Sequence, residues 1–238
     1  MTGFTPCRCG ACASTPAVLD RRGFLGAGAL AAMAGVVPLL APGRSHAKTS
    51  LSPDEAVARL MAGNDRFVRG QLDSPKENLD ERRRATVDGQ EPFAAVLSCA
   101  DSRVPVEWVF DQGIGQLFGT RVAGNVVTPE ILASLEYGVA VLGVRAILVL
   151  GHQHCGAVDA AIEGKAAPGQ ISALYAPLRQ AVARGGGEPE AVTKANAEIQ
   201  AGILASASPV LSGAVKQGAL KILPGYYALA TGRVALLA

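Results

Sequence analysis

Two short segments of the sequence hold the side chains best suited to chemistry. Beyond residue 47, the sequence contains two cysteines, Cys99 and Cys155, and two histidines, His152 and His154. Thiolate and imidazole are ligands that zinc prefers, and two cysteines with one histidine leave a fourth position open for water or substrate. The two segments are Ser98-Cys99-Ala100-Asp101-Ser102-Arg103 and Gly151-His152-Gln153-His154-Cys155-Gly156-Ala157.

The spacing of these residues favours a transition-metal site. His152 and Cys155 are separated by two residues, so both can reach one ion from a single loop, while Cys99 arrives from a second strand end. Soft thiolates favour zinc over magnesium or calcium. A disulfide between the two cysteines and a pair of buried free thiols are the alternatives. We favour the metal because every cysteine and histidine beyond residue 47 lies in these two segments.

Each segment follows a short apolar run that is typical of a strand buried on both faces. Phe93–Ser98 leads into Cys99, and Arg145–Leu150 leads into the segment that holds His152. Ligands bind to α/β sheets where loops leave the carboxyl ends of the strands. The sequence therefore predicts that both segments lie at the ligand-binding edge of one sheet.

Strands and helices alternate along the rest of the chain. This alternation predicts the α/β class, with a mainly parallel central sheet flanked by helices. Further strands are expected at Leu117–Ala123, Leu220–Leu223, Tyr226–Ala230 and Arg233–Leu237, and helices at Val106–Phe110, Thr128–Leu142, Cys155–Ile162, Ile171–Ala183 and Pro189–Ala205.

An N-terminal helical arm is expected ahead of this sheet. Ser52-Pro53-Asp54-Glu55 combines a capping serine, a first-turn proline and acids that complement the helix dipole. Apolar residues follow at helical spacing as far as Phe67. The polar stretch from Asp73 to Gln90 predicts a further surface helix and loop.

Residues 1–47 have the pattern of an export signal. Asp20-Arg21-Arg22-Gly23-Phe24-Leu25 opens an Ala/Gly/Leu-rich stretch, and Ser45-His46-Ala47 supplies the small residues that a signal peptidase recognises. The adjacent arginines resemble a twin-arginine signal. We therefore expect cleavage after Ala47, a domain over residues 48–238, and a location in the periplasm or elsewhere outside the cytoplasm by the twin-arginine route.

The alternative for this segment is an uncleaved membrane anchor. Gly23–Ala41 is barely long enough to span a bilayer and contains Pro38, so it would be a weak span, and we expect no stable membrane span in the mature chain. Cys7, Cys9 and Cys12 lie ahead of the arginine pair without further ligands nearby, and we interpret them as non-functional.

The composition excludes several classes of protein. The 238 residues are 49% hydrophobic, 18% charged and 5% aromatic, with a formal net charge of +2. This content supports one buried core and excludes a disordered, collagen-like or disulfide-dense protein. The absence of a basic excess and the few aromatic residues argue against a nucleic-acid partner.

Four motifs resemble those of the β-class carbonic anhydrases. The resemblance covers about residues 51–237, in the order and spacing of that family. It is most specific between residues 90 and 160, where the paired cysteine motifs lie. The motifs are Cys-Ala-Asp-Ser-Arg-Val-Pro at 99–105, Arg-Val-Ala-Gly-Asn at 121–125, Ser-Leu-Glu-Tyr-Gly at 134–138 and Leu-Gly-His-Gln-His-Cys-Gly-Ala at 150–157.

The resemblance implies a zinc enzyme that hydrates carbon dioxide reversibly to bicarbonate and a proton. It implies one zinc ion per chain, bound by Cys99, His152 and Cys155, with zinc-bound hydroxide as the nucleophile. It also implies a catalytic dyad in which Arg103 holds Asp101 so that the carboxylate accepts a hydrogen bond from that hydroxide. In a closed, inactive form of the family the same aspartate, here Asp101, binds the metal itself.

The resemblance further implies a substrate pocket and an assembly. Gln90, Phe118 and Gly156 fall at substrate-binding positions, and family members form homodimers or larger homo-oligomers whose active sites borrow residues from the partner. His154 is the imidazole not assigned to zinc. It is expected to be either an ordinary exposed histidine or a proton shuttle.

Two other functions fit parts of this pattern. A hydrolase of carbon disulfide or carbonyl sulfide could use the same fold and zinc site. A non-catalytic zinc-containing bicarbonate-binding protein is the alternative outside enzymes, and the intact pair Asp101 and Arg103 counts against it.

Overall fold

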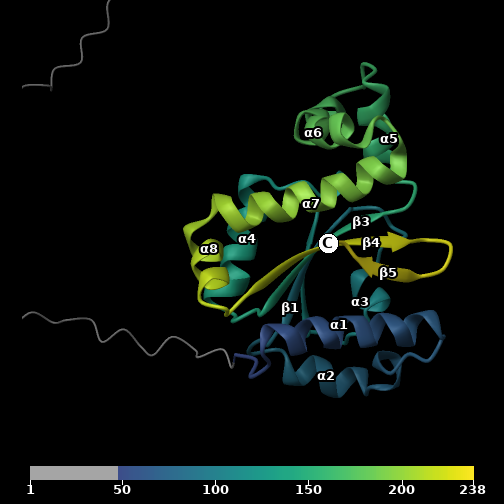
Figure 1. Cartoon of the computed structure of the whole chain (residues 1–238). Helices are drawn as coiled ribbons and strands as arrows, with labels where there is room; N and C mark the ends of the chain where they lie inside the picture. Colours follow the sequence, from purple (N-terminus) through teal and green to yellow (C-terminus); the bar gives the residue numbers. More distant parts are fainter. Residues whose placement is uncertain (1–47) are drawn as a thin grey trace, which may run out of the picture. The chain divides into compact units, whose positions relative to one another are not determined.

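The computed structural model describes residues 48–238, which fold around one central sheet (Figure 1). The expected export signal, its anchor alternative and the three cysteines ahead of the arginine pair lie outside the described residues. Within residues 48–238, no helix has both the length and the apolar character needed to cross a membrane.

The sheet has five strands in the order β2-β1-β3-β4-β5. The first four strands are parallel to their neighbours, and β5 is antiparallel to β4. This confirms the prediction of a mainly parallel α/β sheet. The strands are β1 (Ala94–Ser98), β2 (Leu117–Arg121), β3 (Ala146–His152), β4 (Lys221–Ala228) and β5 (Arg233–Leu236).

Helices cover both faces of this sheet (Figure 1). Helices α1 (Pro53–Val68), α2 (Leu79–Ala85) and α3 (Val106–Val109) lie on one side. Of these, α1 is the expected N-terminal helical arm and α2 the expected surface helix after it. On the other side lie α4 (Pro129–Ala140), α7 (Pro189–Ala207) and α8 (Pro209–Lys216), with α5 (Gly156–Glu163) and α6 (Tyr175–Gly185) beyond them. Short 3₁₀ turns are η1 (Ser74–Lys76), η2 (Ala123–Asn125) and η3 (Ile171–Leu174).

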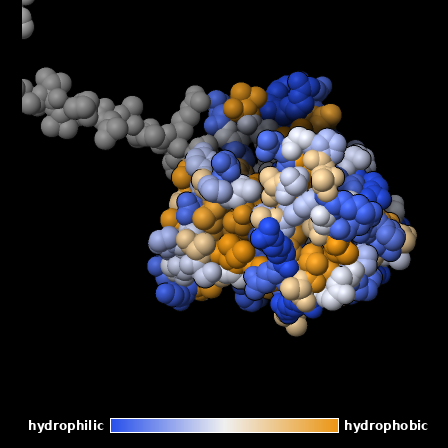
Figure 2. Space-filling model, turned by 90° about the horizontal axis from the view of Figure 1, so that it is seen from above, coloured by the Kyte–Doolittle hydropathy of each residue, from blue (hydrophilic) through white to orange (hydrophobic). Residues whose placement is uncertain are grey.

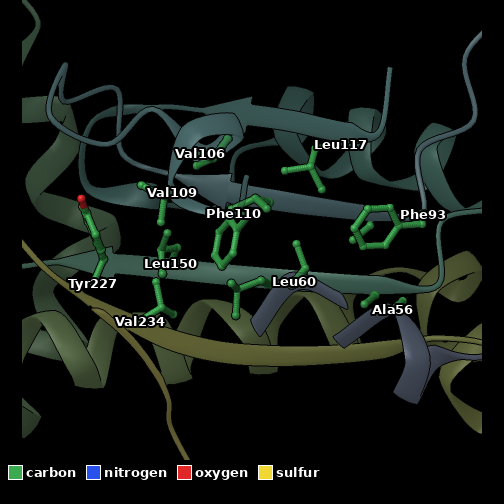
Figure 3. Close-up of a cluster of buried hydrophobic side chains, with 14 of the residues drawn as sticks. Ala56, Leu60, Phe93, Val106, Val109, Phe110, Leu117, Leu150, Tyr227 and Val234 are labelled. Atoms are coloured by element: carbon green, nitrogen blue, oxygen red, sulfur yellow. The ribbon is translucent and has the colours of Figure 1, made fainter. Parts of the chain in front are cut away.

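Alternate residues of the central strands build two separate cores. Val96 of β1 packs with Leu60 of α1 and Phe110 in the cluster of Figure 3. Leu97, the next residue, packs with Leu135 of α4 on the opposite face. All residues of β1 and β3 are buried, as their continuous apolar sequences predict.

Local signals in the sequence start the helices that frame the sheet. Ser52 caps α1 in a capping box with Glu55, and Thr128 caps α4 ahead of Pro129. Ser208 ends α7 and caps α8, with its hydroxyl accepting the N–H of Leu211. These caps fix where each helix begins relative to the strand ends.

Strand β4 differs from the expectation. The two predicted strands at Leu220–Leu223 and Tyr226–Ala230 are a single strand, β4, that runs through Pro224. The Pro224 carbonyl accepts the N–H of Leu237 and therefore faces the β5 side, beyond the last paired residue of β5. In a strand the N–H of a residue faces the same side as its carbonyl, so the N–H that proline lacks would also have faced β5. Because no bond to β3 is lost there, the proline does not interrupt the strand.

Candidate active site

The two chemical segments meet at one edge of the sheet. Strands β1 and β3 are parallel neighbours, with Ser98 opposite Leu150. Cys99 follows the last residue of β1, and His152 is the last residue of β3. Cys155 is the residue immediately before α5. Parallel pairing therefore brings all three side chains to the carboxyl edge of the sheet, as the sequence predicts.

Cys99, His152 and Cys155 form a compact, buried cluster of ligand atoms. One atom from each residue lies within 4.8 Å of the other two. The two sulfur atoms are 3.9 Å apart, and the side chains are at most 4% exposed. The sulfur atoms are too far apart for a disulfide, and both cysteines are free.

The histidine ring is oriented for a ligand at Nε2. Its Nδ1 lies 3.0 Å from the carbonyl oxygen of Gln153, which can only accept, so Nδ1 carries the hydrogen. His152 Nε2 is left with a lone pair, is fully buried, and has no hydrogen-bond partner among the described residues. A buried imidazole nitrogen without a partner is costly unless a ligand fills the site, so it fits a metal ion.

The two thiols share hydrogen bonds that favour one negative charge. The hydrogen bond from the Cys155 thiol lowers the pKa of Cys99, and the N–H of Gly124, 3.3 Å from Cys99 Sγ, lowers it further. The same contact with Cys99 raises the pKa of Cys155. A cation between the sulfur atoms would stabilise both as thiolates, because a metal deprotonates its coordinating thiols.

An ion pair stands beside this cluster. Arg103 donates Nε to Asp101 Oδ1 at 2.9 Å and Nη2 to Asp101 Oδ2 at 2.7 Å. These hydrogen bonds hold the pKa of Asp101 well below its usual range, although partial burial opposes the shift. Asp101 Oδ2 is also 3.9 Å from His152 Nε2. The structure therefore shows an ionised carboxylate next to the cluster and bound to arginine.

Arg121, which the sequence analysis left without a role, clamps the same loop. It lies at the end of β2 and donates Nε to the carbonyl oxygen of Cys99 at 3.1 Å and Nη2 to that of Asp101 at 2.6 Å. The sequence feature that could have drawn attention to Arg121 was its place in the Arg-Val-Ala-Gly-Asn motif. A contact to backbone oxygens of another strand end cannot be inferred from that motif alone.

The remaining predicted site residues lie around or away from the cluster. Gly156 is the first residue of α5, next to Cys155, and a Cβ there would meet no atom within 4 Å. His154 is exposed and left-handed, with φ of 53°, and its carbonyl oxygen accepts Arg103 Nη2 at 3.0 Å. Phe118 is half-buried on β2, with its ring centre 6.4 Å from that of Tyr137.

Gln90 does not lie in the metal cluster. It lines a cavity of about 690 Å³ together with Arg59, Arg82 and Phe93, and none of the three ligand residues lines this cavity. Within one chain, the structure therefore does not bring the predicted glutamine to the predicted zinc ligands.

Comparisons with known proteins agree with this geometry. The sequence profile of the family described as "Carbonic anhydrase" matches residues 94–234, which contain every residue of the cluster and the ion pair. The chain belongs to the β-carbonic anhydrase family. Zinc is the cofactor of this family, and the buried two-cysteine, one-histidine cluster supplies three ligands for it.

Several curated family members are similar in sequence. Carbonic anhydrase 2 of Mycobacterium tuberculosis is 47% identical over 111 residues, which are 47% of this chain and 53% of that protein. A carbonic anhydrase of Pseudomonas aeruginosa is 32% identical over 187 residues, with 71% of this chain and 84% of that protein covered. The match thus spans about half the length of the mycobacterial relative and most of the pseudomonad one.

Solved β-carbonic anhydrases share the fold. The Coccomyxa enzyme in complex with acetazolamide has a TM-score of 0.60 at 27% identity, covering 76% of this chain and 86% of that one. A structure of the tetrameric enzymes of Sordaria macrospora has a TM-score of 0.61 at 22% identity, covering 77% of this chain and 98% of that one. These likenesses confirm the β-carbonic anhydrase architecture.

Proposed function

We propose that this chain catalyses the reversible hydration of carbon dioxide to bicarbonate and a proton. The observation that carries the proposal is the ionised Asp101, held by Arg103, next to three buried side chains that suit zinc. A zinc-binding protein without catalysis would not need an ion pair at this place, whereas a hydratase needs a group that orients its nucleophile.

Each site residue has a defined role in this proposal. Bound zinc supplies a Lewis acid that makes water a nucleophile near neutral pH. Cys99, His152 and Cys155 would supply three ligands to zinc, and a fourth position would remain for water or substrate. The hydrogen bond from His152 Nδ1 to Gln153 fixes the ring so that Nε2 faces the centre.

Asp101 and Arg103 orient the nucleophile. Asp101 Oδ2, 3.9 Å from His152 Nε2, is placed to accept a hydrogen bond from the nucleophile and to direct its lone pair towards carbon dioxide. Arg103 engages both carboxylate oxygens and so keeps Asp101 from becoming a ligand. Release of this ion pair would allow the closed form, in which Asp101 binds the metal.

The test combines metal content with turnover. Purified protein is analysed for zinc by mass spectrometry, and carbon dioxide hydration is followed with a pH indicator in a stopped-flow instrument. We expect one zinc ion per chain and rapid hydration. Stoichiometric zinc without hydration would contradict the proposal, as would preferential hydrolysis of carbonyl sulfide or carbon disulfide.

We also propose a homodimer in which Gln90 of one protomer faces the metal centre of its partner. Support comes from the separate cavity of Gln90 and from large apolar side chains at the surface, including Tyr137, Val141 and Val210. Figure 2 shows apolar patches between hydrophilic side chains on one face of the molecule. Exposed apolar area of this kind is typical of an interaction surface. Phe118 and Gly156 complete the proposed substrate contacts.

Subunit complementation tests this assembly. The Cys99→Ser protomer keeps Gln90 but lacks a metal ligand, and the Gln90→Leu protomer keeps the metal centre. Mixed dimers should contain one complete active site, so combining the two inactive variants should restore activity. If Gln90 acts within its own chain, mixing restores none, and light scattering would then report the assembly alone.

We propose further that residues 1–47 export the folded, zinc-loaded protein by the twin-arginine route and are removed, leaving a domain of residues 48–238 in the periplasm. Support comes from Arg21-Arg22, the apolar stretch that follows and the small residues at Ser45-His46-Ala47. Replacing both arginines with lysine should retain the protein in the cytoplasm. Continued export, or a mature N-terminus ahead of Arg21, would contradict this route.

A further inference from the structure

Two buried amide side chains stand out on helix α7. Asn196 and Gln200 are at most 1% exposed and lie one turn apart on a face otherwise formed by residues such as Ala197 and Leu204. Gln200 Nε2 donates to Asn196 Oδ1 at 3.1 Å, and Gln200 Oε1 accepts the N–H of Val127 at 2.8 Å. The two amides are therefore fixed relative to each other and to the chain after η2.

The side-chain amide of Asn196 donates hydrogen bonds to the η2 turn. Its Nδ2 donates to the carbonyl oxygen of Gly124 at 2.9 Å and reaches Asn125 Oδ1 at 3.4 Å. Gly124 and Asn125 are both left-handed, with φ of 75° and 43°. Two consecutive residues in this region are unfavourable, most of all for the non-glycine residue, so the turn needs support from its surroundings.

The η2 turn also buries a polar group that makes no hydrogen bond. Asn125 Nδ2 is buried and has no hydrogen-bond partner among the described residues. The turn places the N–H of Gly124 so that it donates a hydrogen bond to Cys99 Sγ, with 3.3 Å between nitrogen and sulfur. A hydrogen bond to a ligating sulfur withdraws electron density from it and fixes its direction.

We propose that Asn196 is a positioning residue for the metal centre. It acts through Gly124. The Asn196 amide donates a hydrogen bond to the Gly124 carbonyl and so fixes the turn. The fixed turn keeps the Gly124 N–H hydrogen-bonded to the sulfur of Cys99. Gln200 supports this role by holding Asn196. The inference rests on the proposed zinc site, and it adds to that site a residue from α7, which contributes no ligand.

The proposal predicts a change in the metal–sulfur bond when the hydrogen bond from Asn196 to Gly124 is removed. Without Asn196 the turn relaxes, the N–H leaves Cys99 Sγ, and the thiolate gains electron density. In cobalt-substituted protein, the sulfur-to-cobalt charge-transfer band should then move to longer wavelength. Loss of such indirect support also weakens metal binding, by about 10- to 100-fold in comparable sites.

A matched control is available in helix α1. Asn64 is also 1% exposed and makes three hydrogen bonds, to the carbonyl oxygens of Val109 and Gly232 and from the N–H of Val234. None of these partners touches the metal cluster. Asn64→Ala therefore removes a buried amide with comparable structural cost and leaves the metal centre unchanged.

The experiment compares Asn196→Ala, Asn64→Ala and wild-type protein. Metal affinity is measured by competition with a chromophoric chelator, and the cobalt spectrum is recorded for each protein. Asn196→Ala should shift the band and weaken affinity at least tenfold, whereas Asn64→Ala should change neither. Gln200→Met removes the hydrogen bond that supports Asn196, together with the acceptor of the Val127 N–H. It should shift the band in the same direction by less, and it provides the test if Asn196→Ala does not fold.

Three results would overturn the inference. These are an unchanged band and affinity in both α7 variants, an equal change in Asn64→Ala, or a band that moves to shorter wavelength. Failure of the wild-type protein to bind cobalt or zinc would overturn the proposed function together with this inference, so the two failures are distinguishable.

Discussion

Arg103 joins the two loops of the active site through its contact with His154. The guanidinium Nη2 that binds Asp101 Oδ2 at 2.7 Å also donates to the carbonyl oxygen of His154 at 3.0 Å. The loop after β1 and the loop after β3 are thus held together by one side chain, directly beside the proposed metal ligands.

Replacing either member of the ion pair should remove most activity. Asp101→Asn should keep zinc and lower kcat/KM by about 100-fold or more, because the acceptor that orients the nucleophile is lost. Arg103→Ala should be equally damaging, since it frees Asp101 to bind the metal and releases the His154 carbonyl. Stopped-flow hydration with parallel zinc analysis provides the measurement. Rates near that of the wild type in both variants would exclude a catalytic dyad.

Cys99→Ser should lose the metal and destabilise the fold. The cluster connects the ends of β1 and β3, so bound zinc adds its binding free energy to the stability of the folded protein. A chelator should lower the melting temperature of the wild-type protein and leave that of Cys99→Ser unchanged. Stoichiometric zinc in the variant would remove Cys99 from the ligand set.

His154 offers a test of backbone geometry. Its φ of 53° is easily adopted by asparagine and poorly by a β-branched residue. His154→Asn should keep kcat/KM, while His154→Val should lower it by moving the carbonyl away from Arg103. Equal activity of the two variants would contradict this role. The proton-shuttle role stays a separate prediction, which a drop in kcat of His154→Asn in weak buffer, restored by added imidazole, would support.

Asp111 should make the protein sensitive to acid. Burial alone would raise its pKa, but the N–H groups of Ser74 and Asp73 and the guanidinium of Arg66 outweigh burial and lower the pKa to about 2. Because folding lowers this pKa from about 3.9, the ionised carboxylate stabilises the folded protein above about pH 4. This contribution, about 2 to 3 kcal/mol, is lost progressively as the pH falls from about 5 to below 2.

The measurement for Asp111 is urea unfolding at pH 5 and at pH 2.5. Asparagine tolerates the left-handed conformation of this residue, with φ of 48°, so Asp111→Asn isolates the charge. The loss of unfolding free energy between the two pH values should be smaller in Asp111→Asn by about 2 kcal/mol. An identical loss in both proteins would show that the ionised carboxylate of Asp111 does not stabilise the fold.

Much of the fold could be predicted because its signals are local. Apolar runs identified β1 and β3, and caps such as Ser52 and Thr128 marked helix starts. Helix α8 was missed: no element was predicted between Ala205 and Leu220, and eight residues make only about two helical turns, too few to show a period clearly. Strand β3 also runs two residues further than predicted, so His152 lies in the strand rather than in a loop.

The site could be predicted only as far as residue types allow. Cysteine and histidine are rare and chemically distinctive, so Cys99, His152 and Cys155 were found from the sequence. Arg121 and Asn196 bind backbone oxygens of distant residues, and Gly124 acts through its own backbone N–H. Such contacts depend on how helices pack on strand ends. For Asn196, the available signal was an amide four residues before Gln200 on an apolar helix face.

The parallel sheet also sets the order of events during folding. Ala94 pairs with Ala146, and Ala146 pairs with Lys221, so neither central strand can find its neighbour within a local hairpin. Pairings this distant along the chain form slowly, after long loops have closed. Cys99 meets His152 and Cys155 only when β1 and β3 are already paired, so the complete set of three ligands forms after this long-range step. Binding by all three ligands therefore reports that β1 and β3 have paired, which is one of the long-range steps of folding.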